Sequence, residues 1–147
     1  MDNVRVGQRV TVEPCIVCGK CDACRHGDYG YCEHISFTYR NGDGAMADYV
    51  VVKAPYVYEL PEYLTYETGA LIEPLSVATH AVRRAQVALG ETVLIIGAGA
   101  IGMMVAAMCR RSGAAQVIIA DFSDSRLEMA LQVGATIAIN SGKADLE

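Results

Sequence analysis

The stretch Thr92-Val-Leu-Ile-Ile-Gly-Ala-Gly-Ala-Ile-Gly102 decides the fold of this chain. An apolar run rich in β-branched residues leads directly into glycines spaced as G-x-G-x-x-G, and an apolar helical pattern follows. A strand, a glycine turn and a helix in this order are typical of the start of a dinucleotide-binding unit. The stretch therefore predicts an α/β fold that contains the first half of a Rossmann parallel sheet with its helices.

Each glycine of this turn has its own expected role. Gly97 allows the tight turn, and Gly99 lets a pyrophosphate approach the backbone. Gly102 lets the helix pack closely on the sheet. The free amide groups of the helix N-terminus would then face the phosphates.

An acidic residue follows at the distance that such a unit requires. Ser112-Gly113 ends the first helix, residues 116–120 form a buried parallel strand, and Asp121 stands at the carboxyl end of that strand. A carboxylate there accepts hydrogen bonds from the ribose hydroxyls and repels a 2′-phosphate, so NAD is favoured over NADP. The alternative is a helix-capping or solvated acid. Arg126 lies either beside the ribose or against the carboxylate of Asp121 or Asp124.

The pattern beyond this acid predicts a second helix and a third strand. Ser125 and Glu128 have the spacing of a capping box, so the helix should begin there. Gly134 should end it. Residues 136–140 should form the third strand.

Four cysteines near the N-terminus, Cys18, Cys21, Cys24 and Cys32, are spaced closely enough to close one tetrahedral metal site. Zinc in a structural site takes four such thiolates and leaves no position open for substrate. Cys15 keeps an iron–sulfur alternative open, because it extends the run of short gaps. A disulfide lobe is the other alternative. We expect structural zinc in a lobe at residues 15–34.

The middle of the chain predicts short strands followed by a helical connection. Residues 47–52 and 56–60 have the composition of strands. A helical pattern at residues 66–85 is interrupted at Glu73-Pro74, so Glu73 should lie on a bend before a helix that starts at Pro74. There its carboxylate either projects into a site or only offsets the helix dipole.

Composition favours a cytoplasmic protein. The chain has 147 residues, of which 52% are hydrophobic, and a net charge of −5. No basic patch indicates nucleic acid. The uncharged run at residues 92–109 is interrupted by the three glycines of the turn, so we expect no membrane span.

These motifs resemble the zinc-dependent alcohol dehydrogenases of the medium-chain dehydrogenase/reductase superfamily, most closely the sorbitol and threonine dehydrogenase branch. Val6-Gly-Gln-Arg-Val10 is similar to the family's strand entry, and Gly69-Ala-Leu-Ile-Glu-Pro-Leu-Ser-Val77 is similar to the segment leading into its cofactor domain. The four cysteines have the family's structural-zinc spacing. The resemblance implies a partial GroES-like, β-rich catalytic domain at residues 1–85 and a partial dinucleotide-binding domain at residues 86–147.

The resemblance also implies roles for individual residues. Glu73 matches a glutamate near the catalytic zinc and its water. Asp121 and Arg126 stand at the positions that bind the adenosine end of NAD, and Ala100 and Ile101 lie against the cofactor. The substrate of the parent enzyme would be an alcohol or polyol, oxidised from secondary alcohol to ketone with hydride transfer to NAD.

The family's catalytic-zinc cysteine and His-Glu pair have no counterpart among residues 1–14. We therefore expect a fragment of a longer enzyme, inactive as this chain alone, with catalytic zinc only in the full-length parent. The alternatives are a non-catalytic module that binds zinc and nucleotide or serves dimerisation and, more remotely, an iron–sulfur electron carrier. A homo-oligomer is expected, because half a sheet exposes an edge.

Overall fold

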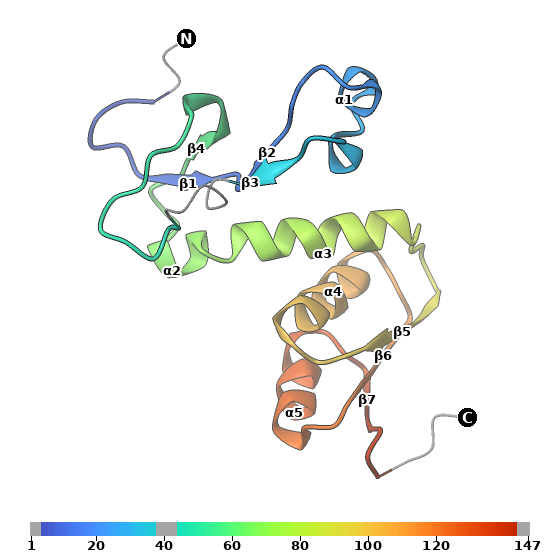
Figure 1. The fold of residues 1–147 in the computed structure, drawn as a ribbon. Coiled ribbons are helices and arrows are strands. Elements are labelled where there is room, and N and C mark those ends of the chain that lie inside the picture. Colours follow the sequence, from blue (N-terminus) through green and yellow to red (C-terminus); the bar gives the residue numbers. More distant parts are fainter. Residues whose placement is uncertain (1–3, 38–43, 144–147) are drawn as a thin grey trace. The chain divides into compact units, whose positions relative to one another are not determined.

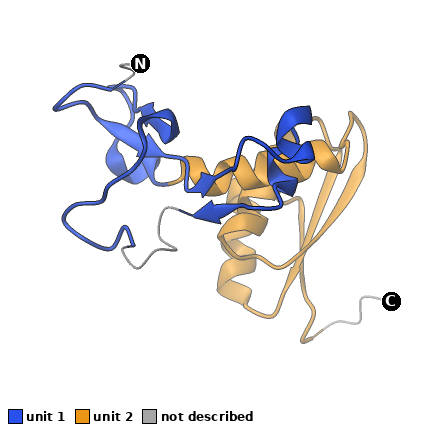
Figure 2. Ribbon diagram, turned by 45° about the horizontal axis from the view of Figure 1, so that its top comes forward, with its two compact units in different colours: residues 1–70 blue, residues 71–147 orange. Residues whose placement is uncertain are grey.

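The computed structural model describes residues 4–37 and 44–143. Figure 1 shows its helices and strands, and Figure 2 shows the two compact units into which it separates, residues 1–70 and 71–147. In the described part, no helix is both long and apolar enough to cross a membrane.

The first unit contains two antiparallel strand pairs. The strands are β1 (Val10–Val12), β2 (Cys15–Ile16), β3 (Ser36–Phe37) and β4 (Val57–Glu59). β1 pairs with β4 and β2 pairs with β3. The helical segments are α1 (Asp22–His26), α2 (Tyr66–Gly69) and the single turns η1 (Tyr29–Tyr31) and η2 (Ala54–Tyr56).

One of the two strands expected in the middle of the chain forms and the other does not. β4 confirms a strand within residues 56–60. The strand expected at residues 47–52 is wrong, since the structure gives these residues no strand. A strand needs a partner that completes its ladder of hydrogen bonds, and the described ladders of this unit are only β1–β4 and β2–β3. Tyr49 and Val51 are instead more than nine-tenths exposed.

Arg9 stabilises the segment that follows β4 through hydrogen bonds to its backbone. Its guanidinium donates hydrogen bonds to the carbonyl oxygens of Pro61, Glu62 and Leu64. The guanidinium carbon also lies 4.6 Å from the centre of the Tyr66 ring. A planar group with several donors can reach three carbonyls at once, which an ammonium cannot reproduce.

Replacing Arg9 by lysine should therefore lower the stability of the first unit. We expect a loss of about 1–2 kcal/mol in the free energy of unfolding, because hydrogen bonds to charged groups contribute about 1.5–3 kcal/mol each when well shielded and these are partly exposed. Urea unfolding, followed by the spectroscopic signal of the nearby tyrosines, measures this free energy of unfolding. The Arg5→Lys variant is the control at an exposed arginine, and an equal loss in both would contradict the role of Arg9.

The second unit is a three-stranded parallel sheet with helices. Its elements are α3 (Ile72–Arg84), β5 (Thr92–Ile96), α4 (Ala100–Arg111), β6 (Gln116–Asp121), α5 (Asp124–Val133) and β7 (Ile137–Asn140). The strand order is β5-β6-β7, with Ile96 opposite Ala120 and Asp121 opposite Asn140. The three expected strands and the helix between the first two are confirmed.

The core of this unit lies on one face of the sheet. Ile95, Val117 and Ile119 are at most 8% exposed and pack with residues of α3, α4 and α5. Leu94 and Ile96, which alternate with Ile95 along β5, remain 56% and 82% exposed. Apolar residues on both faces of a strand are typical of a parallel sheet that is covered on both faces.

α3 packs against α4 and buries Ala78 and Val82 completely or nearly so. This packing places α3 in the second compact unit, whereas the boundary expected after residue 85 would place it in the first.

Two helix starts differ from those expected. α3 begins at Ile72, so Glu73 lies within the helix and not on a bend before it. Pro74 falls in the first turn, where no intrahelical N–H is needed, and the interruption of the helical pattern comes earlier, between α2 and α3.

α5 begins at Asp124, after an N-cap at Ser123, and the capping box expected at Ser125 and Glu128 is wrong. The reason lies upstream: Ser123 donates its backbone N–H to the carboxylate of Asp121, which fixes the entry of the chain into the helix. Gly134 ends α5 as expected.

The turn after α3 holds a residue in the left-handed region. Gln86 has a φ of 53°, where a Cβ is unfavourable by roughly 1–2 kcal/mol, and it follows the C-cap of α3 at the position that glycine usually takes. We expect Gln86→Gly to raise the free energy of unfolding of the second unit by about 0.5–1 kcal/mol. Thermal unfolding of the variant checks this, with Gln132→Gly in the last turn of α5 as a control that should be destabilised.

Candidate metal and cofactor sites

The four cysteines expected to hold metal come together in the first unit. Their Sγ atoms all lie within 4.8 Å of one another, and the Sγ atoms of Cys18 and Cys24 are 3.9 Å apart. A tetrahedron with zinc–sulfur bonds of about 2.3 Å has sulfurs about 3.8 Å apart. The four thiols therefore lie within about 1 Å of the spacing that one tetrahedral zinc ion requires.

Local structure brings these cysteines together. Cys21 is the N-cap of α1, Cys24 lies within α1, and Cys32 ends η1. Gly19 and Gly27 turn the chain with φ values of 69° and 83°, which other residues avoid.

Backbone amides beside the cluster favour the ionised thiolate form of one of its cysteines, Cys18. The amides of Lys20 and Cys21 donate to Sγ of Cys18 at 3.5 and 3.4 Å. These bonds lower the pKa of Cys18 to about 6. Burial instead raises the pKa of Cys24 to about 12. A bound cation favours the ionised form of both thiols.

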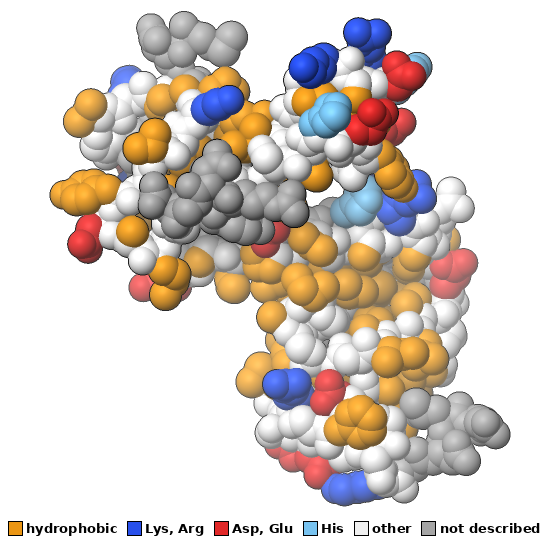
Figure 3. All heavy atoms as spheres, viewed as in Figure 1, with side chains coloured by type: hydrophobic (Ala, Val, Ile, Leu, Met, Phe, Trp, Pro, Cys, Tyr) orange, Lys and Arg blue, Asp and Glu red, His pale blue; other side chains and the backbone are white. Residues whose placement is uncertain are grey.

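Charged side chains gather on the surface of this lobe (Figure 3). They include the exposed residues Lys20, Asp22, Arg25, His26 and Asp28. The ring of His26 hydrogen-bonds through Nδ1 to the carbonyl oxygen of Asp22, at 2.8 Å, within its own helix. Among the described residues, only the four cysteines form a cluster that could hold a metal, and Cys15 and His34 lie outside it.

The three glycines of the turn in the second unit have different structural roles. Gly97 has a φ of 101° and makes the turn, and Gly99 is the N-cap of α4. A Cβ on Gly102 would lie 1.9 Å from the carbonyl oxygen of Gly97, so no other residue fits there. A Cβ on Gly99 would meet nothing within 4 Å, which leaves its backbone open to a ligand.

Asp121 lies at the end of β6 and contacts this turn directly. Its Oδ2 accepts a hydrogen bond from the amide of Ala98 at 2.7 Å, and its Oδ1 accepts one from the amide of Ser123 at 2.9 Å. The two amides, and to a smaller extent the charge of Arg126, hold the pKa of Asp121 below its usual value. The sequence predicted the position of this acid but gave no sign of its bond to Ala98.

The surroundings of Arg126 bear on which carboxylate its side chain faces, that of Asp121 or that of Asp124. Asp124, one possible partner, is hydrogen-bonded to Asn140 and paired with Lys143, each at 2.6 Å. The pKa of Asp124 is lowered by the bond from Lys143 and then by that from Asn140. The electrostatic effect of Arg126 falls instead on Asp121.

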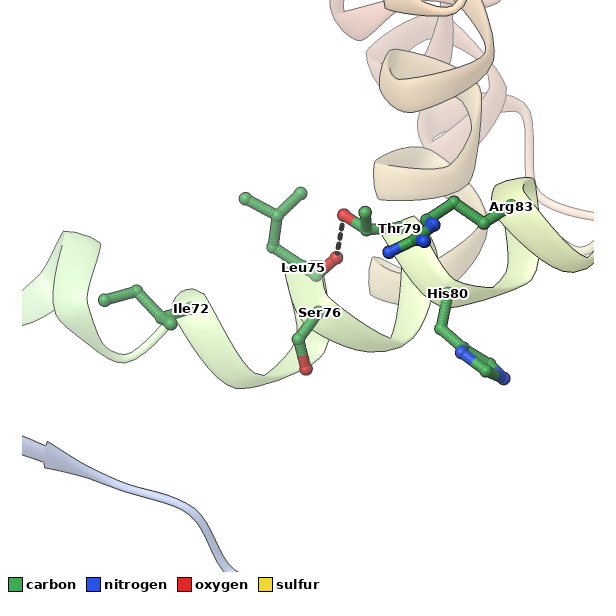
Figure 4. Close-up of a pocket in the computed structure, with 6 residues that line it drawn as sticks. All are labelled: Ile72, Leu75, Ser76, Thr79, His80 and Arg83. Carbon is green, nitrogen blue, oxygen red and sulfur yellow. Dashed lines mark hydrogen bonds between the residues drawn. The ribbon is translucent and has the colours of Figure 1, made fainter. Parts of the chain in front are cut away.

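Glu73 and His80 lie on α3. Both are exposed, and within the described residues Glu73 belongs to no cluster of potential metal ligands. A shallow hollow of about 360 Å³ runs along this helix (Figure 4). It is lined by Ile72, Leu75, Ser76, Thr79, His80 and Arg83. The hydroxyls of Ser76 and Thr79 donate to the carbonyls of Glu73 and Leu75 in the same helix, so this hollow shows no prepared site.

Comparison with known proteins adds family matches for both parts of the chain. Residues 1–62 match the alcohol dehydrogenase GroES-like domain, and residues 100–147 match the zinc-binding dehydrogenase domain. Sorbitol dehydrogenase of Bacillus subtilis is 40% identical over 146 residues, which are 99% of this chain and 41% of that protein.

Two solved structures show the same fold over almost the whole chain. A putative zinc-binding dehydrogenase from Sinorhizobium meliloti, bound to NADP, has a TM-score of 0.94 and 32% identity over 99% of this chain and 43% of its own. Galactitol-1-phosphate dehydrogenase from Escherichia coli has a TM-score of 0.90 and 35% identity over 99% of this chain and 42% of its own. The chain thus spans about two fifths of the length of these relatives.

Proposed function

We propose that this chain, which belongs to the zinc-dependent alcohol dehydrogenase family, supplies the structural-zinc lobe and the adenosine-binding part of an enzyme that oxidises a secondary alcohol of a polyol with NAD. The expected family and fold class are confirmed by the two family matches and by the structural neighbours. The relatives named above are a sorbitol dehydrogenase, a galactitol-1-phosphate dehydrogenase and a putative zinc-binding dehydrogenase, and none of these matches supports an iron–sulfur carrier. The observation that carries the proposal is the glycine turn with Asp121 beside it.

In the proposed zinc lobe, Cys18, Cys21, Cys24 and Cys32 are the ligands. Four thiolates fill the tetrahedron, so the ion leaves no position open for an alcohol. Its contribution is to hold a short segment that has a small core of its own, in which Cys24 and Cys32 are 7% and 6% exposed. The lobe is structural in this account.

In the proposed cofactor site, the chain binds the adenosine and phosphate parts of NAD. The open backbone at Gly99 admits the pyrophosphate, and the first amides of α4, at Ala100 and Ile101, face it. Asp121 accepts hydrogen bonds from the ribose hydroxyls, and Arg126 lies at the adenosine end. Because its pKa is lowered, Asp121 is charged at neutral pH and repels a 2′-phosphate.

The proposed reaction removes a hydride from the carbinol carbon and a proton from its hydroxyl, and the proton is released to water. NAD would accept the hydride, and a catalytic zinc would stabilise the alkoxide as a Lewis acid. Glu73 is proposed to act near that second ion, from the first turn of α3. The described residues contain no cluster of ligands for it, so turnover by the 147-residue chain is not expected unless another chain provides them. A homo-oligomer in the cytoplasm remains part of this proposal.

Calorimetric titration of the purified chain with NAD and with NADP tests the cofactor part. We expect binding of NAD, and at least about tenfold weaker binding of NADP, because a like charge must approach Asp121. Titration with ADP-ribose, which lacks the nicotinamide, should give nearly the same heat and affinity as NAD. Absence of binding for all three would contradict the proposed cofactor site, and equal affinity for NAD and NADP would contradict the role of Asp121.

A further inference from the structure

We infer that Asp121 also holds the glycine turn in the shape that accepts a pyrophosphate. This positioning role is separate from its contact with the ribose, and it rests on the proposed function of the turn as a phosphate site. It makes one side chain responsible for both ends of the adenosine diphosphate.

The contacts of the turn support this inference. The amide of Gly97 donates to the carbonyl oxygen of Ala120 at 2.7 Å and continues the ladder between β5 and β6. The next amide, that of Ala98, has left the ladder and finds its acceptor in Oδ2 of Asp121. Ala98 is fully buried, so this amide would pay a penalty of desolvation without that acceptor.

Apart from the methyl group of Ala98, which packs in the core, no side chain of the turn holds it in place. Gly97 and Gly99 carry no side chains, and a Cβ at either position would touch nothing within 4 Å. Glycine also loses more backbone freedom on folding than other residues. The shape of the turn therefore depends on its hydrogen bonds as well as on the packing of Ala98, and the bond from Ala98 to Asp121 is the one that a side-chain substitution can remove.

The two roles are compatible in one carboxylate. A carboxylate offers about four lone-pair sites, and the amides of Ala98 and Ser123 occupy one on each oxygen. Sites remain on both oxygens for the hydroxyls of a ribose. The side chain is only partly buried, so a ligand can reach it.

The two roles predict opposite effects on a ligand that has phosphates but no ribose. If Asp121 acted only on the ribose, its neutralisation would leave the binding of inorganic pyrophosphate unchanged or would strengthen it, since a like charge is removed. If Asp121 positions the turn, neutralisation weakens pyrophosphate binding. The direction of the change in pyrophosphate affinity therefore distinguishes the positioning role from a role in ribose binding alone.

The Asp121→Asn variant of the complete chain tests this inference, with Asp124→Asn as the matched control. The amides of Ala98 and Ser123 bond to different oxygens of Asp121, and asparagine replaces one of these oxygens by an NH₂ group that cannot accept, so it cannot keep both bonds in the observed geometry. Asp124 lies three residues away, carries the same charge and bonds to Asn140 and Lys143 instead of the turn. Asp121→Ser, which can accept from at most one of the amides at a shorter reach, is the second variant.

Amide hydrogen exchange and titration with sodium pyrophosphate, both followed residue by residue in NMR spectra, are the measurements. In the Asp121 variants we expect the Ala98 amide to exchange about 10- to 100-fold faster, with Val117 and Ile119 in β6 still protected, and pyrophosphate to bind more weakly. In Asp124→Asn both should stay within about twofold of the original chain. Unchanged exchange at Ala98, or tighter pyrophosphate binding by Asp121→Asn, would overturn the inference.

Two further outcomes distinguish failure of this inference from failure of the proposed function. If the original chain binds neither NAD nor pyrophosphate, the proposed function fails, and exchange at Ala98 alone then decides whether Asp121 holds the turn. If the Asp121 variants do not fold, acid titration of the original chain decides. The amide protons of Ala98 and Ser123 should then shift together, with one midpoint below the usual pKa of aspartate, and separate midpoints would overturn the inference.

Discussion

We expect the Cys24→Ser variant to lose the proposed zinc ion and the lobe at residues 15–34 to unfold. Cys24 lies in α1 and is 7% exposed, so its replacement leaves three thiolates around the ion and a buried hydroxyl that is a poor ligand. Binding of structural zinc by small peptides contributes about 10–16 kcal/mol, which is also their folding free energy. Because the described part of the first unit has few buried apolar residues besides these cysteines, we expect this loss to exceed that of substitutions there outside the four proposed ligands.

Zinc content by mass spectrometry and the tyrosine circular dichroism signal measure this effect. Cys15→Ser is the matched control, because it makes the same chemical change at a cysteine outside the cluster. It should retain one zinc and the original signal. Retention of zinc with undiminished affinity by Cys24→Ser, or equal loss in both variants, would contradict the assignment of the four ligands.

We expect the Gly102→Ala variant to lose both stability and the proposed binding of NAD. Its Cβ would lie 1.9 Å from the carbonyl oxygen of Gly97, and backbone cannot give way as a flexible side chain does. The turn and the start of α4 must separate, which we expect to lower the free energy of unfolding of the second unit by about 3 kcal/mol or more, at the upper end of overpacking effects.

Gly99→Ala is the control for this prediction, since it adds the same methyl group three residues earlier in the motif. Its Cβ meets nothing within 4 Å and its φ of −76° suits alanine, so stability should change by less than about 1 kcal/mol. NAD binding should nevertheless fall at least about tenfold, because the methyl occupies the space proposed for the pyrophosphate. Urea unfolding and calorimetry together check the pair, and similar stability losses in the two variants would count against the geometry of the turn.

The sequence predicted the elements that local patterns determine. Thr92–Ile96, the turn and α4 follow one another in the chain, and strand composition, glycine spacing and helical periodicity are all visible there. The cysteine spacing likewise predicted which thiols gather, because the four lie within a short segment. These elements needed no knowledge of distant contacts.

The elements that depend on distant partners were predicted less well. Residues 47–52 have the composition of a strand but pair with no described strand. The start of α5 was misplaced because Asp121 captures the amide of Ser123, and the bond from Ala98 to Asp121 joins residues that are 23 positions apart. Spacing alone could place Asp121 at the end of a strand, but only the register of β5 against β6 brings it to the turn.

Native mass spectrometry of the purified chain, with and without NAD, is the most direct test of the account. One zinc ion per 147-residue chain, and a further mass of one NAD per chain when the cofactor is added, are the results that we predict. A second zinc would mean that Glu73 has found partners for a catalytic ion. A chain that carries no zinc, or that carries iron and sulfide instead, and that takes up no NAD would contradict the central claim.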